Sequence, residues 1–97
     1  MESARCKAFM YAADTGSFTK AAERLNYTPS GVSQLVGALE NETGLTLLRR
    51  TRKGVTLTPD GEILLPAVRE FLEKENRIYE LAAEVKGLHR FDFLFQE

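Results

Sequence analysis

Cysteine and histidine are nearly absent from this chain, and their scarcity excludes several classes of protein. Among 97 residues there are one cysteine and one histidine. The lone Cys6 cannot form an internal disulfide, and its helix-compatible neighbours favour a buried structural thiol. With a single histidine, His89, and no acidic residues clustered at ligand spacing, neither a metal site nor a catalytic triad is expected. The sequence therefore argues against an enzyme and predicts no cofactor.

Long apolar runs are missing as well. No stretch approaches the roughly 18–20 consecutive apolar residues of a membrane span. Residues 1–7 lack the basic-then-apolar pattern of a secretory signal. We therefore expect a cytoplasmic protein with no membrane partner. An apolar content of 43% in 97 residues suffices for one small domain with one modest core.

The net charge is small, at −1, but the charges are unevenly distributed. Residues 1–58 hold eight Lys and Arg against five Asp and Glu, whereas residues 59–97 hold five against nine. Four of the cations lie within residues 49–53. A basic half of this kind is compatible with a nucleic-acid partner, although the whole chain is nearly neutral.

Three helices are predicted in the first half of the chain. Apolar residues recur at helical spacing over Ser3–Asp14, Phe18–Leu25 and Pro29–Thr43. Ser17 and Thr28 precede the second and third segments as N-cap residues. A short helix, a three-residue turn and a longer helix in this order are typical of a helix-turn-helix.

Residues 49–57 follow as a predicted hairpin. Its tip is Arg52-Lys53-Gly54, and Val55 and Leu57 then alternate with a polar residue at strand period. A basic hairpin behind a helix-turn-helix is a wing. The expected fold class is therefore mainly α: a winged helix-turn-helix of three helices and a two-stranded wing, followed by a long helix.

The long fourth helix begins at the cap signal Thr58-Pro59 and is expected to end near Lys86, with Gly87 at its terminus. At about 28 residues and about 42 Å, it is too long to bury a whole face against the preceding body. We expect it to pair with a second copy of itself in a homodimer. The candidate dimer contacts are its apolar residues Leu64, Ala67, Val68, Phe71, Ile78, Leu81, Ala82 and Val85.

The predicted third helix has two chemically different faces. One face is aliphatic, and a second, polar and uncharged face consists of Ser30, Ser33, Gln34, Gly37 and Asn41. Small hydroxyls, an amide and a glycine suit close approach to base edges, where glutamine can pair bidentately with adenine. An exposed face of weak helix formers is the alternative interpretation. The basic wing nearby favours double-stranded DNA as the partner.

The other candidate DNA contacts have alternative roles. Ser17 and Thr28 cap helix N-termini whose free N–H groups favour phosphate, and simple capping explains both residues as well. For Lys20, phosphate contact and plain solvation are both open. The wing cations could lie along the DNA backbone, reach the minor groove or serve solubility alone. The full candidate set is Ser17, Thr19, Lys20, Thr28, Pro29, Ser30, Ser33, Gln34, Gly37, Arg50, Arg52 and Lys53.

Residues 5–61 resemble the N-terminal domain of LysR-type transcriptional regulators, and the long helix extends the likeness to about residue 87. The likeness is carried by the strings Ser17-Phe18-Thr19-Lys20-Ala21-Ala22-Glu23-Arg24-Leu25, Thr28-Pro29-Ser30-Gly31-Val32-Ser33-Gln34, Leu39-Glu40, Gly44-Leu45, Leu47, Arg50, Gly54, Leu57-Thr58-Pro59 and Gly61. Any one string is weak, but together they are specific to the family.

The resemblance implies a sequence-specific activator or repressor on the bacterial nucleoid. Such a protein binds an inverted-repeat operator as a dimer, often as a tetramer, and its linker helix pairs antiparallel with its copy. The positions of Ser30, Ser33 and Gln34 would face the major groove. The segment 49–55, with Arg50 and its basic neighbours, would form the wing on the backbone or minor groove.

This chain also departs from the family. Many members have Gln at Pro29, Arg at Gln34 and a basic or polar residue at Gly37, so this chain should recognise different bases. The implied organisation is a DNA-binding domain at 1–58, a linker and dimerisation helix at 59–87, and a tail of uncertain structure at 88–97. By this resemblance we expect residues 1–97 not to include the family's effector-binding domain, so a small-molecule effector is expected only if the native protein carries such a domain.

The competing function is a winged-helix module that dimerises or binds other proteins without binding DNA. A surface of that kind would more often expose aromatic or apolar anchors than the three cations Arg50, Arg52 and Lys53. The charge of the wing therefore favours DNA.

Overall fold

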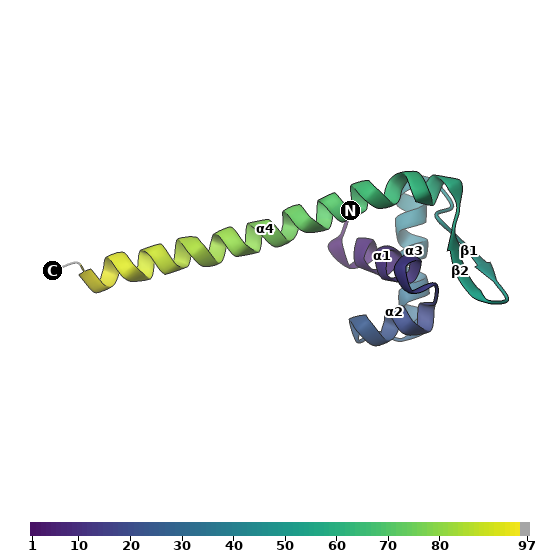
Figure 1. The fold of residues 1–97 in the computed structure, drawn as a ribbon, viewed down its shortest axis with the longest axis horizontal. Coiled ribbons are helices and arrows are strands. Elements are labelled where there is room, and N and C mark those ends of the chain that lie inside the picture. Colours follow the sequence, from purple (N-terminus) through teal and green to yellow (C-terminus); the bar gives the residue numbers. More distant parts are fainter. Residues whose placement is uncertain (96–97) are drawn as a thin grey trace.

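The computed structural model describes the backbone of residues 1–95 and the side chains of residues 1–89. Its elements follow in the order α1 (Ser3–Thr15), α2 (Phe18–Leu25), α3 (Pro29–Thr43), β1 (Leu48–Thr51), β2 (Gly54–Leu57) and α4 (Pro59–Phe95). Figure 1 shows the first three helices packed together, with the two-stranded wing at one end and α4 projecting away in the opposite direction. The predicted winged helix-turn-helix with a long final helix is confirmed.

Local capping explains where α2 and α3 begin. The Ser17 hydroxyl accepts the backbone N–H of Lys20 at 3.2 Å, and the Thr28 hydroxyl accepts that of Gly31 at 3.0 Å. Each bond satisfies an N–H group that has no partner within its own helix. Asn26 ends α2 in the left-handed region, with φ 57°, so the chain can turn at once toward α3. The capping role expected for both residues is confirmed.

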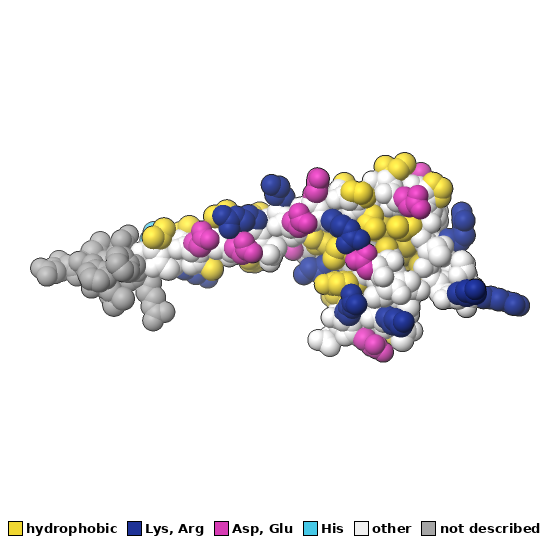
Figure 2. All heavy atoms as spheres, in the orientation of Figure 1, with side chains coloured by type: hydrophobic (Ala, Val, Ile, Leu, Met, Phe, Trp, Pro, Cys, Tyr) yellow, Lys and Arg dark blue, Asp and Glu magenta, His cyan; other side chains and the backbone are white. Residues whose placement is uncertain are grey.

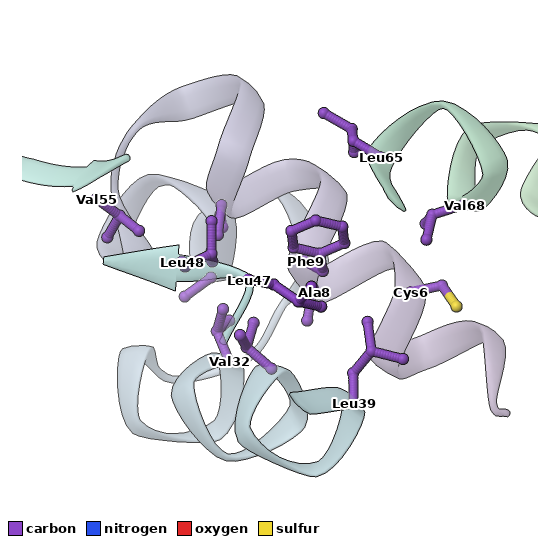
Figure 3. Close-up of a cluster of buried hydrophobic side chains, with 14 residues drawn as sticks. Cys6, Ala8, Phe9, Val32, Leu39, Leu47, Leu48, Val55, Leu65 and Val68 are labelled. Carbon is purple, nitrogen blue, oxygen red and sulfur yellow. The ribbon is translucent and has the colours of Figure 1, made fainter. Parts of the chain in front are cut away.

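The hydrophobic core lies where α1, α2 and α3, the wing and the first turns of α4 meet (Figure 3). The largest fully buried side chains are those of Phe9, Leu39, Leu47, Val32 and Cys6. Burying an aliphatic or aromatic side chain contributes about 1.5–3 kcal/mol, so this cluster is the main source of stability. Burial also raises the pKa of the Cys6 thiol, which disfavours a reactive thiolate and confirms the buried structural role.

The first turns of α4 belong to this core. Leu65 and Val68 are only 8% and 4% exposed, and Arg69 donates to Asp14 of α1 at 3.0 Å. Val68, expected among the dimer contacts, is therefore not available to a second copy: its side chain is already covered by the protomer's own body. From residue 76 to residue 89, by contrast, every side chain is exposed.

The expected helix end at Gly87 is wrong, because α4 continues through this glycine to Phe95. A single glycine inside a helix costs only about 1 kcal/mol relative to alanine, and it ends a helix only where the backbone turns left-handed. Residues 88–95, whose structure the sequence left open, therefore extend α4. Within the described residues, no helix combines the length and the apolar character needed to cross a membrane.

Candidate nucleic-acid interface

The two faces of α3 are separated as the sequence predicts. Val32, Val36 and Leu39 are buried against the body. On the other face Ser30, Gln34 and Asn41 are exposed, while Ser33 and Gly37 are half-buried. The helix therefore presents an uncharged surface of short side chains and one longer amide, Gln34, to the outside.

The wing lies beside this surface. Strands β1 and β2 pair antiparallel, from Leu48 opposite Leu57 to Thr51 opposite Gly54, which leaves Arg52 and Lys53 at the tip. Both tip residues are exposed and make no ion pair with any described residue. Figure 2 shows the dark-blue side chains extending from this end of the molecule into solvent. The two cations are free to meet an anionic partner.

Arg50 differs from the two tip residues. It lies in the middle of β1, opposite Val55, but its side chain crosses back to the helices. Its guanidinium carbon lies 4.8 Å from the centre of the Phe18 ring at the start of α2, and its Nη2 donates to Ser33 Oγ on α3. Arg50 therefore joins the wing to both helices of the helix-turn-helix, whereas the sequence grouped it with Arg52 and Lys53.

Hydrogen bonds to the backbone at both ends of the hairpin also attach the wing to the body. The N–H of Val55 donates to the carbonyl oxygen of Gly16, in the turn between α1 and α2, at 2.9 Å. Gly54 has φ +133°, and a Cβ at this position would lie 2.2 Å from that same oxygen. Only glycine fits there. Just before β1, the half-buried carboxylate of Glu40 accepts the N–H of Leu47 at 2.7 Å.

Sequence reasoning missed the role of Glu40, although Leu39-Glu40 was part of the family resemblance. Its Oε2 also lies 3.4 Å from the N–H of Leu48, at the start of β1. Because Glu40 is on the same helix as Ser33 and Gln34, it fixes the wing relative to the polar face. The sequence signal that could have indicated this role was a glutamate directly after a leucine of the predicted core.

Thr58 caps the start of α4, as the sequence predicts, and it also joins the two ends of the hairpin, which the sequence did not predict. The Thr58 hydroxyl donates to the carbonyl oxygen of Thr46 at 2.6 Å and accepts the N–H of Gly61 at 3.0 Å. The N–H of Thr58 donates to the carbonyl oxygen of Leu47 at 3.0 Å. The string Leu57-Thr58-Pro59 with Gly61 thus joins the end of β2 to the start of α4.

The remaining candidate residues surround the polar face. Thr19, Lys20, Thr28 and Pro29 are exposed and Ser17 is half-buried, all at the N-terminal ends of α2 and α3. The structure shows the capping bond of Ser17 to the N–H of Lys20 and that of Thr28 to the N–H of Gly31, and no hydrogen bond between the two caps among the described residues. It shows no partner that would decide between solvation and phosphate contact for Lys20.

The acidic residue at the other end of α3 is neutralised. Glu42 accepts a hydrogen bond from Arg5 at 2.5 Å, and the N-terminal ammonium group lies 3.4 Å from its other oxygen. The hydrogen bond from Arg5 holds the pKa of Glu42 below its ordinary value. The pairing ties α1 to α3 and reduces the negative charge near the candidate interface.

Comparison with known proteins agrees with this architecture. Residues 4–62 match the family described as "Bacterial regulatory helix-turn-helix protein, lysR family". YvbU of Bacillus subtilis (strain 168), an uncharacterized HTH-type transcriptional regulator, is 41% identical over 83 residues. The match covers 84% of this chain but 28% of YvbU, so the chain spans less than a third of that relative.

Two solved structures have the same fold in complexes with DNA. The CbnR_DBD–DNA complex superposes with a TM-score of 0.81 at 30% identity, covering 89% of this chain and 99% of that one. The complex of BenM_DBD with catB site 1 DNA superposes with a TM-score of 0.83 at 27% identity, covering 92% and 96%. This chain belongs to the LysR family of bacterial regulatory helix-turn-helix proteins, a family of transcriptional regulators and not of enzymes.

Proposed function

We propose that this chain is the DNA-binding part of a LysR-type transcriptional regulator. The observation that carries the proposal is the uncharged outer face of α3 beside Arg52 and Lys53 at the wing tip, two exposed cations that form no ion pair with the residues described. An uncharged face with Gln34 at its centre suits base edges in the major groove. Two flexible cations suit the phosphate backbone or the minor groove.

Within this proposal, the candidate residues have separate roles. Ser30, Ser33 and Gln34 read bases. Gly37 faces open space, since a Cβ there would meet nothing within 4 Å, and its missing side chain allows close approach. The N-terminal ends of α2 and α3 contact phosphates through free backbone N–H groups and through Lys20. CbnR_DBD and BenM_DBD, which are similar to this chain in fold, were both solved in complex with DNA, and this supports DNA as the proposed partner.

The proposed assembly is a homodimer formed through α4. An apolar stripe runs along its exposed part at alternating spacings of three and four residues, as in a two-stranded coiled coil. Beyond Leu64 and Ala67, its members and their exposed fractions are Phe71 at 37%, Ile78 at 65%, Leu81 at 43%, Val85 at 48% and Leu88 at 65%. Lys74 occupies one position of the same series. Exposed apolar side chains in this pattern favour a second copy as their partner.

A dimer places two copies of α3 on one duplex, so the proposed operator is an inverted repeat. The location proposed for such a regulator is the cytoplasm, on the nucleoid. A tetramer and a small-molecule effector are proposed only for a longer protein of the kind that YvbU represents, of which this chain spans 28%.

The rival function is a winged helix that binds proteins alone. The test is fluorescence anisotropy of the 97-residue chain with mixed-sequence duplex DNA at increasing salt. A DNA-binding protein should lose affinity with a log–log slope of about −0.9 per phosphate contacted. Absence of binding at about 50 mM salt and micromolar protein would favour the rival. Selection from random duplexes should then enrich an inverted repeat whose half-sites lie about one or more helical turns apart.

A further inference from the structure

Arg50 is fixed by two contacts that leave little freedom to its guanidinium group. The group lies over the Phe18 ring, with 4.8 Å between its central carbon and the ring centre, and Nη2 donates to Ser33 Oγ. The residues in contact are 17 positions apart in the chain and come from β1 and α3. A guanidinium stacked on a ring is planar and pre-oriented, which a lysine ammonium is not.

The contact determines how the Ser33 hydroxyl can be used. A serine hydroxyl has one hydrogen to donate and two lone pairs, whereas arginine is a donor only. Arg50 must therefore occupy a lone pair of Ser33. It leaves the O–H free, and its positive charge makes this O–H a stronger donor and the remaining lone pair a weaker acceptor.

The helix backbone does not compete for this hydrogen. Thr15 and Thr43 donate their hydroxyls to the carbonyl oxygens four residues earlier, at 2.7 Å and 3.0 Å. Ser33 makes no such bond to Pro29 or to any other described residue. Its O–H is therefore available to a group outside the protein.

We propose that Arg50 is a positioning residue that holds Ser33 as a hydrogen-bond donor toward the major groove. The inference rests on the proposed function, because it requires α3 to lie in that groove. A serine held as a donor prefers base atoms that accept, such as purine N7, guanine O6 and thymine O4, over the amino groups of adenine and cytosine. A strand of the wing thus sets the base preference of the helix.

The test compares base preference, and not only affinity, among variants of the full chain. Ser33→Ala, Arg50→Lys, Arg50→Met and the Ser33→Ala/Arg50→Lys double variant are each used in selection from random duplexes. Lysine keeps the charge at position 50, and methionine keeps an apolar contact with the Phe18 ring. Arg49→Lys is the matched control, because Arg49 is an exposed arginine of the same strand with no contact to Phe18 or Ser33 among the described residues.

We expect both Arg50 variants to reduce discrimination at the base pair affected by Ser33→Ala by about 3- to 10-fold, as for the loss of one oriented hydrogen bond. The double variant should lose no more than Ser33→Ala does, and Arg49→Lys should keep the wild-type preference. Equal weakening on every sequence, or additive effects in the double variant, would make Arg50 a phosphate contact and overturn the proposal. A wild-type chain that enriches no sequence would overturn the proposed function as well.

Discussion

The first turn of α4 passes so close to the segment before β1 that a Cβ on Gly61 would lie 2.1 Å from the carbonyl oxygen of Leu47. That oxygen also accepts the N–H of Thr58, so it cannot move without breaking a hydrogen bond. The position of α4 relative to the wing therefore depends on the absence of a side chain at residue 61.

Gly61→Ala should lower the free energy of unfolding by about 1–3 kcal/mol, because the backbone must shift to admit the methyl group. Urea denaturation followed by circular dichroism measures the change. Gly87→Ala is the control, since Gly87 lies in the same helix and a Cβ there would meet nothing within 4 Å. The control should leave stability unchanged or raise it by at most about 1 kcal/mol. Similar losses in both variants would contradict the close contact at Gly61.

The pair between Arg5 and Glu42 predicts an acid dependence of stability. Arg5 lowers the pKa of Glu42 in the folded state, below the ordinary value of 4.5. Its stabilising contribution is therefore complete above the unfolded pKa and is lost as the pH falls through the folded pKa. Glu42→Gln should flatten the decline of the melting temperature below about pH 5.

Glu23→Gln serves as the control for this pH series. Glu23 is exposed on α2 and forms no ion pair with the described residues. Its removal should leave the shape of the pH profile as in the wild type. An unchanged profile for Glu42→Gln would show that the pair has no net effect on folding.

Gln34 and Arg52 should differ in what their loss does to DNA binding. Gln34→Ala is expected to reduce discrimination at one base pair by about 1–3 kcal/mol, because it removes a base-reading amide. Arg52→Ala should weaken all duplexes alike and reduce the salt slope by about 1. Anisotropy titrations on the selected site and on single-base variants separate the two effects. Equal losses on every sequence for both variants would remove Gln34 from base reading.

Ile78 should be needed for dimer formation. A glutamate at this position of the apolar stripe would place one buried charge from each copy in the interface, which costs several kcal/mol. Ile78→Glu should therefore raise the dimer dissociation constant by at least about 100-fold, or ~3 kcal/mol. Sedimentation velocity at micromolar concentration measures the dimer fraction.

Tyr79→Glu is a close control for Ile78→Glu. Tyr79 is 70% exposed and Ile78 is 65% exposed, but Tyr79 lies one residue on, about 100° around the helix and off the stripe. The control should remain dimeric. A monomeric wild-type chain, or equal dissociation of both variants, would show that the stripe is not the dimer interface.

Most helix bounds could be predicted because their signals are local. Ser17 and Thr28 cap the helices that follow them, and α2 and α3 begin and end where the sequence indicated. The helix end predicted at Gly87 was wrong because a single glycine is a weak signal. Glycine can lie inside a helix as well as end one.

The sequence by itself therefore determined the winged helix-turn-helix, the polar face of α3 and the basic wing tip, because periodicity, caps and turn residues act over a few positions. Only the tertiary structure decided which residues join these parts. It placed the Glu40 carboxylate on the amides at the start of the wing, Arg50 between Phe18 and Ser33, and Val68 in the protomer's own core. These contacts join residues from different elements. They form only when the elements pack together, so the local spacing of residue types could not predict them.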